Sequence, residues 1–222
     1  MGCCQSKGAD VRVNRVARWR STGIVALRDA KLKTFPDEVL DLDRTVRTLD
    51  LTNNKLVDIP MEISKLINMQ RLILAGNLIE RLPINLGKLQ SLKIMTLDGN
   101  QITSLPDELG QLVRLEQLSI SGNMLTSLPE TIGSLRNLSL LNVSNNKLKS
   151  LPESIGSCFS LEEIQANGIK FSEDSGLSGW ISFDEILLST YKDLRCFRTV
   201  VLNGALLLSI ISKTMIRWGP LS

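Results

Sequence analysis

The residues of this chain that are best suited to covalent chemistry lie together at its start. Gly2 follows the initiator methionine, Cys3 and Cys4 lie beside it, and Ser6 follows four residues after the glycine. A glycine amine freed by removal of Met1, with serine at this spacing, is the pattern for N-myristoylation. The neighbouring thiols are candidates for S-palmitoylation, and a second lipid makes stable an attachment that one lipid leaves reversible. The sequence therefore predicts lipid attachment at Gly2, Cys3 and Cys4.

The charge of the first twenty residues favours the same interpretation. They carry five basic residues and one acidic residue, a net charge of +4, whereas the rest carries 21 basic and 22 acidic residues. Basic side chains beside a lipid anchor are attracted to an anionic leaflet by about 1 kcal/mol each. We expect contact with the membrane through the anchor and this basic segment. The expected location is the cytoplasmic face of the plasma membrane, or the cytoplasm when the chain is not acylated.

Catalytic chemistry is not expected. The chain contains no histidine, which excludes histidine-based triads and removes the commonest metal ligand. Neither glycine-rich phosphate-binding motif occurs, and Cys158 and Cys196 are isolated, so no disulfide framework is predicted and a reducing compartment fits. We expect no enzyme activity, no cofactor and no metal site.

One unit recurs through the middle of the chain at a fixed step of 23 residues. Apolar residues follow the pattern L-x-x-L-x-L-x-x-N-x-L and then L-P, most clearly from Leu115 to Pro129. Two independent markers with one period predict a repeat architecture, which offers a long binding surface. The markers are Asn54, Asn77, Asn100, Asn123 and Asn146, and Pro60, Pro83, Pro106, Pro129 and Pro152.

The spacing within a unit predicts a short strand followed by a tight turn. Leu118 and Ile120 are two residues apart, so both point to the buried side of a strand. An asparagine amide can satisfy backbone groups where the chain turns away, so the five asparagines should form a structural ladder. Proline followed by acidic residues suits the first position of a short helical or 3₁₀ turn. A glycine four residues after the proline, such as Gly110, is expected to permit a tight exit.

Residues between the buried positions of each strand should face the concave side of the solenoid. Ile73, Ile94 and Leu140 are apolar there, which favours a protein partner over nucleic acid, since nucleic acid requires a basic stripe. The alternative is that they are ordinary, scattered surface hydrophobic residues. The predicted partner-binding residues are Thr48, Asp50, Arg71, Ile73, Ile94, Thr96, Gln117, Ser119, Leu140 and Asn142.

The repeats divide the chain into four segments. Residues 1–22 form a lipid-anchor segment with an N-terminal capping helix, 23–45 a leading half-repeat, 46–167 five full repeats and a partial sixth, and 168–222 a non-repeat apolar tail. The tail contains an apolar run of about 12 residues, against about 20 for a membrane-spanning helix. Packing on the last repeat, insertion into a membrane and a poorly ordered tail all remain open. The abrupt loss of period indicates an alternative or read-through carboxyl terminus.

The units resemble those of intracellular Ras-group-type leucine-rich repeat proteins. The resemblance covers residues 24–166 and rests on the pattern L-P-x-x-[LI]-G-x-L, seen from Leu105 to Leu112 and from Leu128 to Leu135. It implies an α/β solenoid, a horseshoe with a parallel concave sheet and short helical or 3₁₀ turns on the convex side. We expect a monomeric, non-catalytic adaptor in intracellular signalling, and the resemblance implies a small GTPase or a kinase as its partner. The alternatives are an integral membrane protein anchored by residues 199–216, or a truncated isoform with reduced function.

Overall fold

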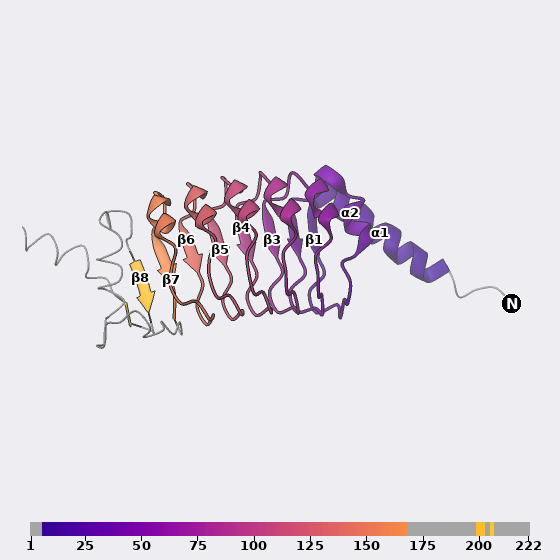
Figure 1. The fold of residues 1–222 in the computed structure, drawn as a ribbon. Helices are drawn as coiled ribbons and strands as arrows, with labels where there is room; N and C mark the ends of the chain where they lie inside the picture. Colours follow the sequence, from indigo (N-terminus) through magenta and orange to yellow (C-terminus); the bar gives the residue numbers. More distant parts are fainter. Residues whose placement is uncertain (1–5, 168–198, 203–204, 207–222) are drawn as a thin grey trace, which may run out of the picture.

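The chain winds into a solenoid whose strands lie side by side in chain order (Figure 1). The computed structural model describes residues 6–167, 199–202 and 205–206. Within these residues, strands β1 to β8 run parallel to their neighbours and β9 pairs antiparallel with β8. The strands are β1 Ile24–Ala26, β2 Thr48–Asp50, β3 Arg71–Ile73, β4 Ile94–Thr96, β5 Gln117–Ser119, β6 Leu140–Asn142, β7 Glu163–Gln165, β8 Thr199–Leu202 and β9 Ala205–Leu206.

The middle residue of each strand from β1 to β7 forms the spine of the core. The strand register places Leu72 beside Met95, and Met95 beside Leu118, so that buried side chains of successive repeats stack directly. Because the flanking residues of a strand point to its other face, each strand buries one side chain and presents two. The row consists of Val25, Leu49, Leu72, Met95, Leu118, Leu141 and Ile164, and all of them are fully buried.

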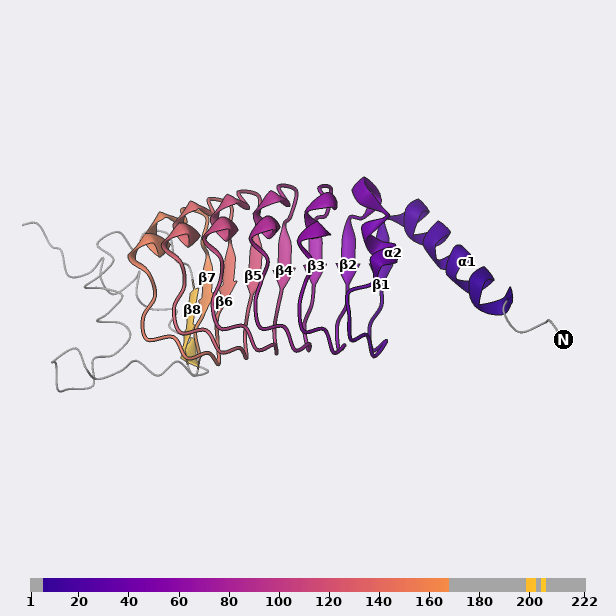
Figure 2. The same ribbon diagram turned by 45° about the vertical axis from the view of Figure 1, so that its right-hand side comes forward.

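Short turns complete each repeat, and Figure 2 shows them stacked along one edge of the solenoid. The first two are the helical turn α2 Asp37–Leu40 and the 3₁₀ turn η1 Asp43–Thr45. Five further 3₁₀ turns recur with the repeat: η2 Met61–Lys65, η3 Ile84–Lys88, η4 Asp107–Gln111, η5 Glu130–Ser134 and η6 Glu153–Ser157. Each repeat proline lies one residue before its turn, with φ between −71° and −67°, rather than at the first position of the turn.

The glycine in the 3₁₀ turns η3, η4 and η5 has a different role from the expected tight exit. Gly110 does not have a positive φ. A Cβ atom on it would lie 2.5 Å from the carbonyl oxygen of Thr131 in the next repeat. The glycine is therefore required by the close approach of neighbouring turns. The left-handed position of the repeat lies elsewhere, directly before the ladder asparagines, at Asn53, Gly76, Gly99, Gly122 and Asn145.

Helix α1, Ser6–Thr22, covers the amino-terminal end of the solenoid. Gly23 ends it with φ +69°, and its N–H donates to the carbonyl of Trp19 at 2.8 Å. Trp19 is buried in the core, and the guanidinium of Arg15 lies 4.9 Å from its ring and pairs with Glu38 at 2.6 Å. The amino-terminal part of α1 extends away from the strands (Figure 1). The helix thus shields the first repeat, whose apolar side chains have no preceding repeat to cover them.

The two ends of the predicted repeat region contain regular elements. Residues 23–45 include β1, α2 and η1, and the sixth unit contributes β7 with Leu161, Ile164 and Ala166 buried. Of the predicted apolar tail, only β8 and β9 lie within the described residues, and they extend the sheet. The rest of the segment proposed as a membrane anchor, 203–204 and 207–216, lies outside them. In the described part of the chain, no helix has the length and apolar character needed to cross a membrane.

Candidate binding face

The ten residues predicted to bind a partner occupy the first and third positions of strands β2 to β6. In β3, for example, these are Arg71 and Ile73, which flank the buried Leu72. Parallel pairing without a register shift aligns Arg71 with Thr48 on one side and with Ile94 on the other. The structure therefore brings all ten residues together on one face of the sheet, in two rows that run across the strands. We call this surface the concave face.

Most side chains of the concave face are only partly exposed to solvent. Arg71 and Gln117 are exposed, whereas Ile73, Ile94 and Leu140 are each half-buried. Stacking at about 4.8 Å between strands explains this, because each side chain is flanked by its neighbours in the row. The three apolar residues therefore contribute patches between polar neighbours, and they do not project freely into solvent.

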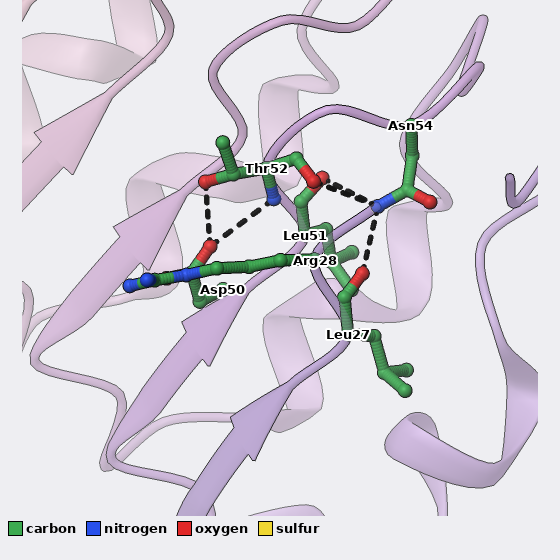
Figure 3. Close-up of polar contacts among 6 residues, drawn as sticks. All are labelled: Leu27, Arg28, Asp50, Leu51, Thr52 and Asn54. Carbon is green, nitrogen blue, oxygen red and sulfur yellow. Dashed lines mark hydrogen bonds and ion pairs between the residues drawn. The ribbon is translucent and has the colours of Figure 1, made fainter. Parts of the chain in front are cut away.

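Asp50 departs from the expected exposure, because it is 2% exposed although it lies on the concave face. Figure 3 shows the side chain of Arg28 lying along its carboxylate. Arg28 Nε donates to Asp50 Oδ2 at 2.6 Å, and the hydroxyl and N–H of Thr52 donate to Oδ1 at 2.6 and 3.1 Å. Burial alone would raise the pKa of Asp50, but these hydrogen bonds and the charge of Arg28 hold that pKa below its ordinary value of 3.8. Asp50 is therefore an ionised, internally paired group.

Arg28 is not among the residues predicted for the binding face. Arg28 lies two residues beyond β1 and 22 residues before Asp50 in the sequence, one fewer than the 23-residue period of the repeat. The two residues therefore do not occupy equivalent positions in their repeats. The signal that could have indicated Arg28 is an aspartate at a strand position where the next repeats carry Ile73, Thr96 and Ser119. A carboxylate at a half-buried position calls for a cation nearby.

Hydrogen bonds also order the polar residues toward the other end of the concave face. Asp98 Oδ1 accepts from the hydroxyl of Ser119 and from the N–H of Ser121, both at 2.7 Å. Asn142 Oδ1 accepts from the N–H of Ser144 at 3.1 Å. These contacts fix side-chain positions before any partner arrives, which lowers the entropy lost on binding.

The five repeat asparagines lie behind the concave face and join neighbouring repeats. Asn100 Nδ2 donates to the carbonyl of Leu74 in the preceding repeat at 3.0 Å and to that of Leu97 in its own at 2.9 Å. Its Oδ1 accepts from the N–H of Ile79 at 3.1 Å. Asn54, Asn77, Asn123 and Asn146 make the equivalent donations, and all five are buried. The ladder makes the concave face a rigid scaffold.

The predicted lipid-attachment residues Gly2, Cys3 and Cys4 lie outside the described residues. Cys158, by contrast, is fully buried, and its thiol donates to the carbonyl of Ile132. Burial raises the pKa of this thiol to about 11. The thiolate is therefore not available at neutral pH for chemistry at Cys158.

Comparison with known proteins agrees with this geometry. A family model described as a leucine-rich repeat region matches residues 84–178, and a second, described as leucine rich repeat, matches 44–102. Together they span more than half of the chain. The chain belongs to the leucine-rich repeat family. Its 3₁₀ turns and parallel sheet are those of a leucine-rich repeat horseshoe.

Individual leucine-rich repeat proteins are similar over different parts of the chain. Plant intracellular Ras-group-related LRR protein 7 of Oryza sativa subsp. japonica is 63% identical over 76 residues, which are 34% of this chain and 29% of the rice protein. The structure of an LRR protein of Leptospira interrogans is 36% identical, with a TM-score of 0.53 over 64% of this chain and 42% of its own. Internalin C2 of Listeria monocytogenes, at 21% identity and a TM-score of 0.55, shares the fold over 84% of this chain and 83% of its own.

The match to the rice protein confirms the predicted resemblance to the intracellular Ras-group type of leucine-rich repeat protein. The Met-Gly start and the repeats also predict a finer resemblance, to leucine-rich repeat-containing protein 57 in a plant-like form, and this stays a prediction. The matched segment spans less than a third of the rice relative's length.

Proposed function

We propose that this chain is a non-catalytic adaptor that binds a signalling protein on its concave face. The observation that carries the proposal is the alignment of the ten residues in two unbroken rows on a rigid sheet. The rows mix apolar patches at Ile73, Ile94 and Leu140 with polar side chains already fixed by hydrogen bonds. Such a mixture suits a protein surface, which presents both kinds of group. The leucine-rich repeat fold is itself a scaffold for protein interaction.

The class of partner in this proposal is a small GTPase, with a kinase as the second candidate. The support is similarity to a protein whose name is Ras-group-related. That name belongs to the rice protein, so a partner for this chain is a proposal by family analogy.

The test replaces two concave residues, Arg71→Glu and Ile94→Glu, in one variant and measures the proteins it captures in cells. We expect the variant to lose its specific partners, because an opposite charge at Arg71 and a half-buried carboxylate at Ile94 are placed in the centre of the proposed contact. A matched control, Lys65→Glu with Ile84→Glu, makes the same changes in the turns η2 and η3, where both side chains are exposed. Retention of all partners by the concave variant would remove this face from the proposal.

Tethering to the cytoplasmic face of the plasma membrane is the second part of the proposed function. It is supported by Gly2, Cys3 and Cys4 in the sequence and by the net charge of +4 in the first twenty residues. Helix α1 directs the amino-terminal end of the described chain away from the strands (Figure 1). A lipid anchor there would leave the concave face open to a partner.

Gly2→Ala tests the tether, because the myristoyl transferase requires a glycine at the processed amino terminus and does not accept alanine there. We expect the variant to move from the membrane fraction to the soluble fraction. Ser6→Thr, which keeps a hydroxyl in the motif, is the matched control and should stay with the membrane. Membrane retention of Gly2→Ala would contradict the lipid anchor.

A further inference from the structure

The charges at the entrance of the concave face are sorted by sign along the solenoid. Two neighbouring rows define this entrance. The edge row holds the residue directly before each strand from β2 to β7: Arg47, Gln70, Lys93, Glu116, Ser139 and Glu162. The first-position row holds the first residue of strands β1 to β7: Ile24, Thr48, Arg71, Ile94, Gln117, Leu140 and Glu163. In both rows every cation lies in or directly before β2 to β4, and every anion lies in or directly before β5 to β7.

From this order we propose that the partner contributes an extended segment with carboxylates at one end, an apolar middle and cations at the other end. The carboxylates would lie over Arg47 and Arg71, and the cations over Glu163 in β7, whose Oε1 also accepts a hydrogen bond from Gln165 at 2.6 Å. The proposal rests on the concave face being the docking surface, and it specifies the chemistry and the direction of what docks there.

The two arginines are open to such a segment. Arg47 and Arg71 are both exposed, and within the described residues neither makes an ion pair. They lie side by side at the starts of adjacent repeats, because the N–H of Arg71 donates to the carbonyl of Arg47, the residue directly before β2, at 3.0 Å. The side-chain stem of Arg47 lies beside Gly23, where a Cβ atom would be 3.4 Å from its Cγ. Two unpaired cations on neighbouring strands make an attractive site for carboxylates.

The other charged pairs of the face mark where this site ends. Lys93 Nζ pairs with Glu116 Oε1 at 2.7 Å, at the point where the rows change sign. Arg28 is neutralised by Asp50 within the sheet. The unpaired positive charge is therefore confined to the starts of β2 and β3.

The spacing of the strands gives the length of the docking segment. Five strand intervals separate β2 from β7, and at about 4.8 Å each they span roughly 24 Å. An extended chain rises about 3.4 Å per residue, so about seven residues separate the acidic end of the segment from its basic end. Ile94 and Leu140, in the first-position row between the two ends, would contact its apolar middle.

The test uses the full chain and two fluorescent twelve-residue peptides of identical composition. The block peptide has three glutamates, then six neutral residues rich in leucine, then three lysines; the alternating peptide distributes the same charges evenly. We expect the block peptide to bind about fivefold more tightly at low ionic strength, and this preference to shrink in high salt. A nitroxide on its acidic end should broaden the amide signals of β2 and β3, and not those of β6 and β7.

Variants show which residues produce the preference. Arg47→Glu with Arg71→Glu should abolish it, and Arg47→Gln with Arg71→Gln, which introduces no repulsion, should reduce it. Lys65→Glu with Lys88→Glu reverses two charges in the turns of the same repeats and should leave it unchanged. Circular dichroism verifies that each variant is folded.

Equal affinity for the two peptides, or no binding of either, overturns the proposal. A second contradicting result is that the chain binds phosphatidylserine vesicles through Arg47 and Arg71 but does not prefer the block peptide. That result would assign these two cations to a membrane surface. If the peptides are not distinguished but Arg71→Glu with Ile94→Glu still loses its cellular partners, only the charge order fails. If that variant keeps its partners, the docking surface itself fails.

Discussion

At the scale of single residues, the ladder asparagines do more than fill the turn of their own repeat. Asn100 connects backbone groups of two repeats through both ends of its amide. Buried backbone groups that lose their partner retain the full cost of desolvation. The stability of each repeat therefore depends on an asparagine in the repeat that follows it.

Asn100→Ala should lower the free energy of unfolding by about 2–4 kcal/mol, because it leaves the buried N–H of Ile79 without its partner and removes one of the two amide donors to the carbonyl of Leu74, which keeps only Asn77. Urea denaturation followed by circular dichroism measures the change. Asn68→Ala is the matched control: Asn68 is exposed and donates only to the carbonyl of Arg44, so a loss below about 1 kcal/mol is expected. Equal losses for the two variants would show that the ladder is not a special source of stability.

Asp50→Asn should destabilise the fold by about 1–2 kcal/mol at pH 7, because it removes the charge from the hydrogen bond that Arg28 donates. The expected loss is modest because Arg28 is exposed and solvent weakens this interaction. The pKa of Asp50 is lowered in the folded state. Its contribution is therefore present above the unfolded pKa, near 3.8, and is lost as the pH falls through the lower folded pKa.

Denaturation of both proteins between pH 2 and pH 7 checks this sign. The difference in unfolding free energy between wild type and Asp50→Asn should shrink below pH 4. Asp58→Asn, at an exposed carboxylate, is the control and should change stability by less than about 0.5 kcal/mol. A difference that is constant over the whole range would show that the charge of Asp50 is not what stabilises the sheet there.

At the scale of the elements, neighbouring 3₁₀ turns approach so closely that glycine is required between them. Gly110→Ala would place a methyl group 2.5 Å from the carbonyl oxygen of Thr131. We expect a loss of about 1–3 kcal/mol from the separation of η4 and η5, measured by thermal or urea denaturation. Ser134→Ala, at an exposed position of the adjacent turn, should be close to neutral. A neutral Gly110→Ala would mean that the turns can move apart without cost.

The repeating parts of these elements could be predicted from the sequence, whereas the exceptions could not. The period alone places Leu118 in a strand and Asn123 in the ladder, because each repeat has the same buried strand position and the same backbone groups that an asparagine must satisfy at the turn. Asp50 could not be placed in the same way, because its partner Arg28 belongs to the leading unit and lies off the 23-residue register. Nor does the period show why Gly110 is a glycine, because the reason is a contact with the following repeat.

At the scale of the whole molecule, a linear solenoid separates its functions along one axis. Helix α1 and Trp19 close the amino-terminal end, and the concave face extends from β2 to β6. The charges at the entrance of that face change sign near its centre, at the pair of Lys93 and Glu116. A partner segment that crosses the strands would therefore meet different chemistry in each repeat, which gives the docking a direction.

Site-specific photo-crosslinking in intact cells tests the central claim most directly. A photoreactive amino acid is introduced in place of Thr96, in the middle of the concave face on β4, or in place of Lys88, in the exposed turn η3 of the preceding repeat. We expect discrete protein adducts from position 96, lost when Arg71→Glu and Ile94→Glu are added, and none from position 88. Adducts from position 88 with none from position 96 would contradict the claim.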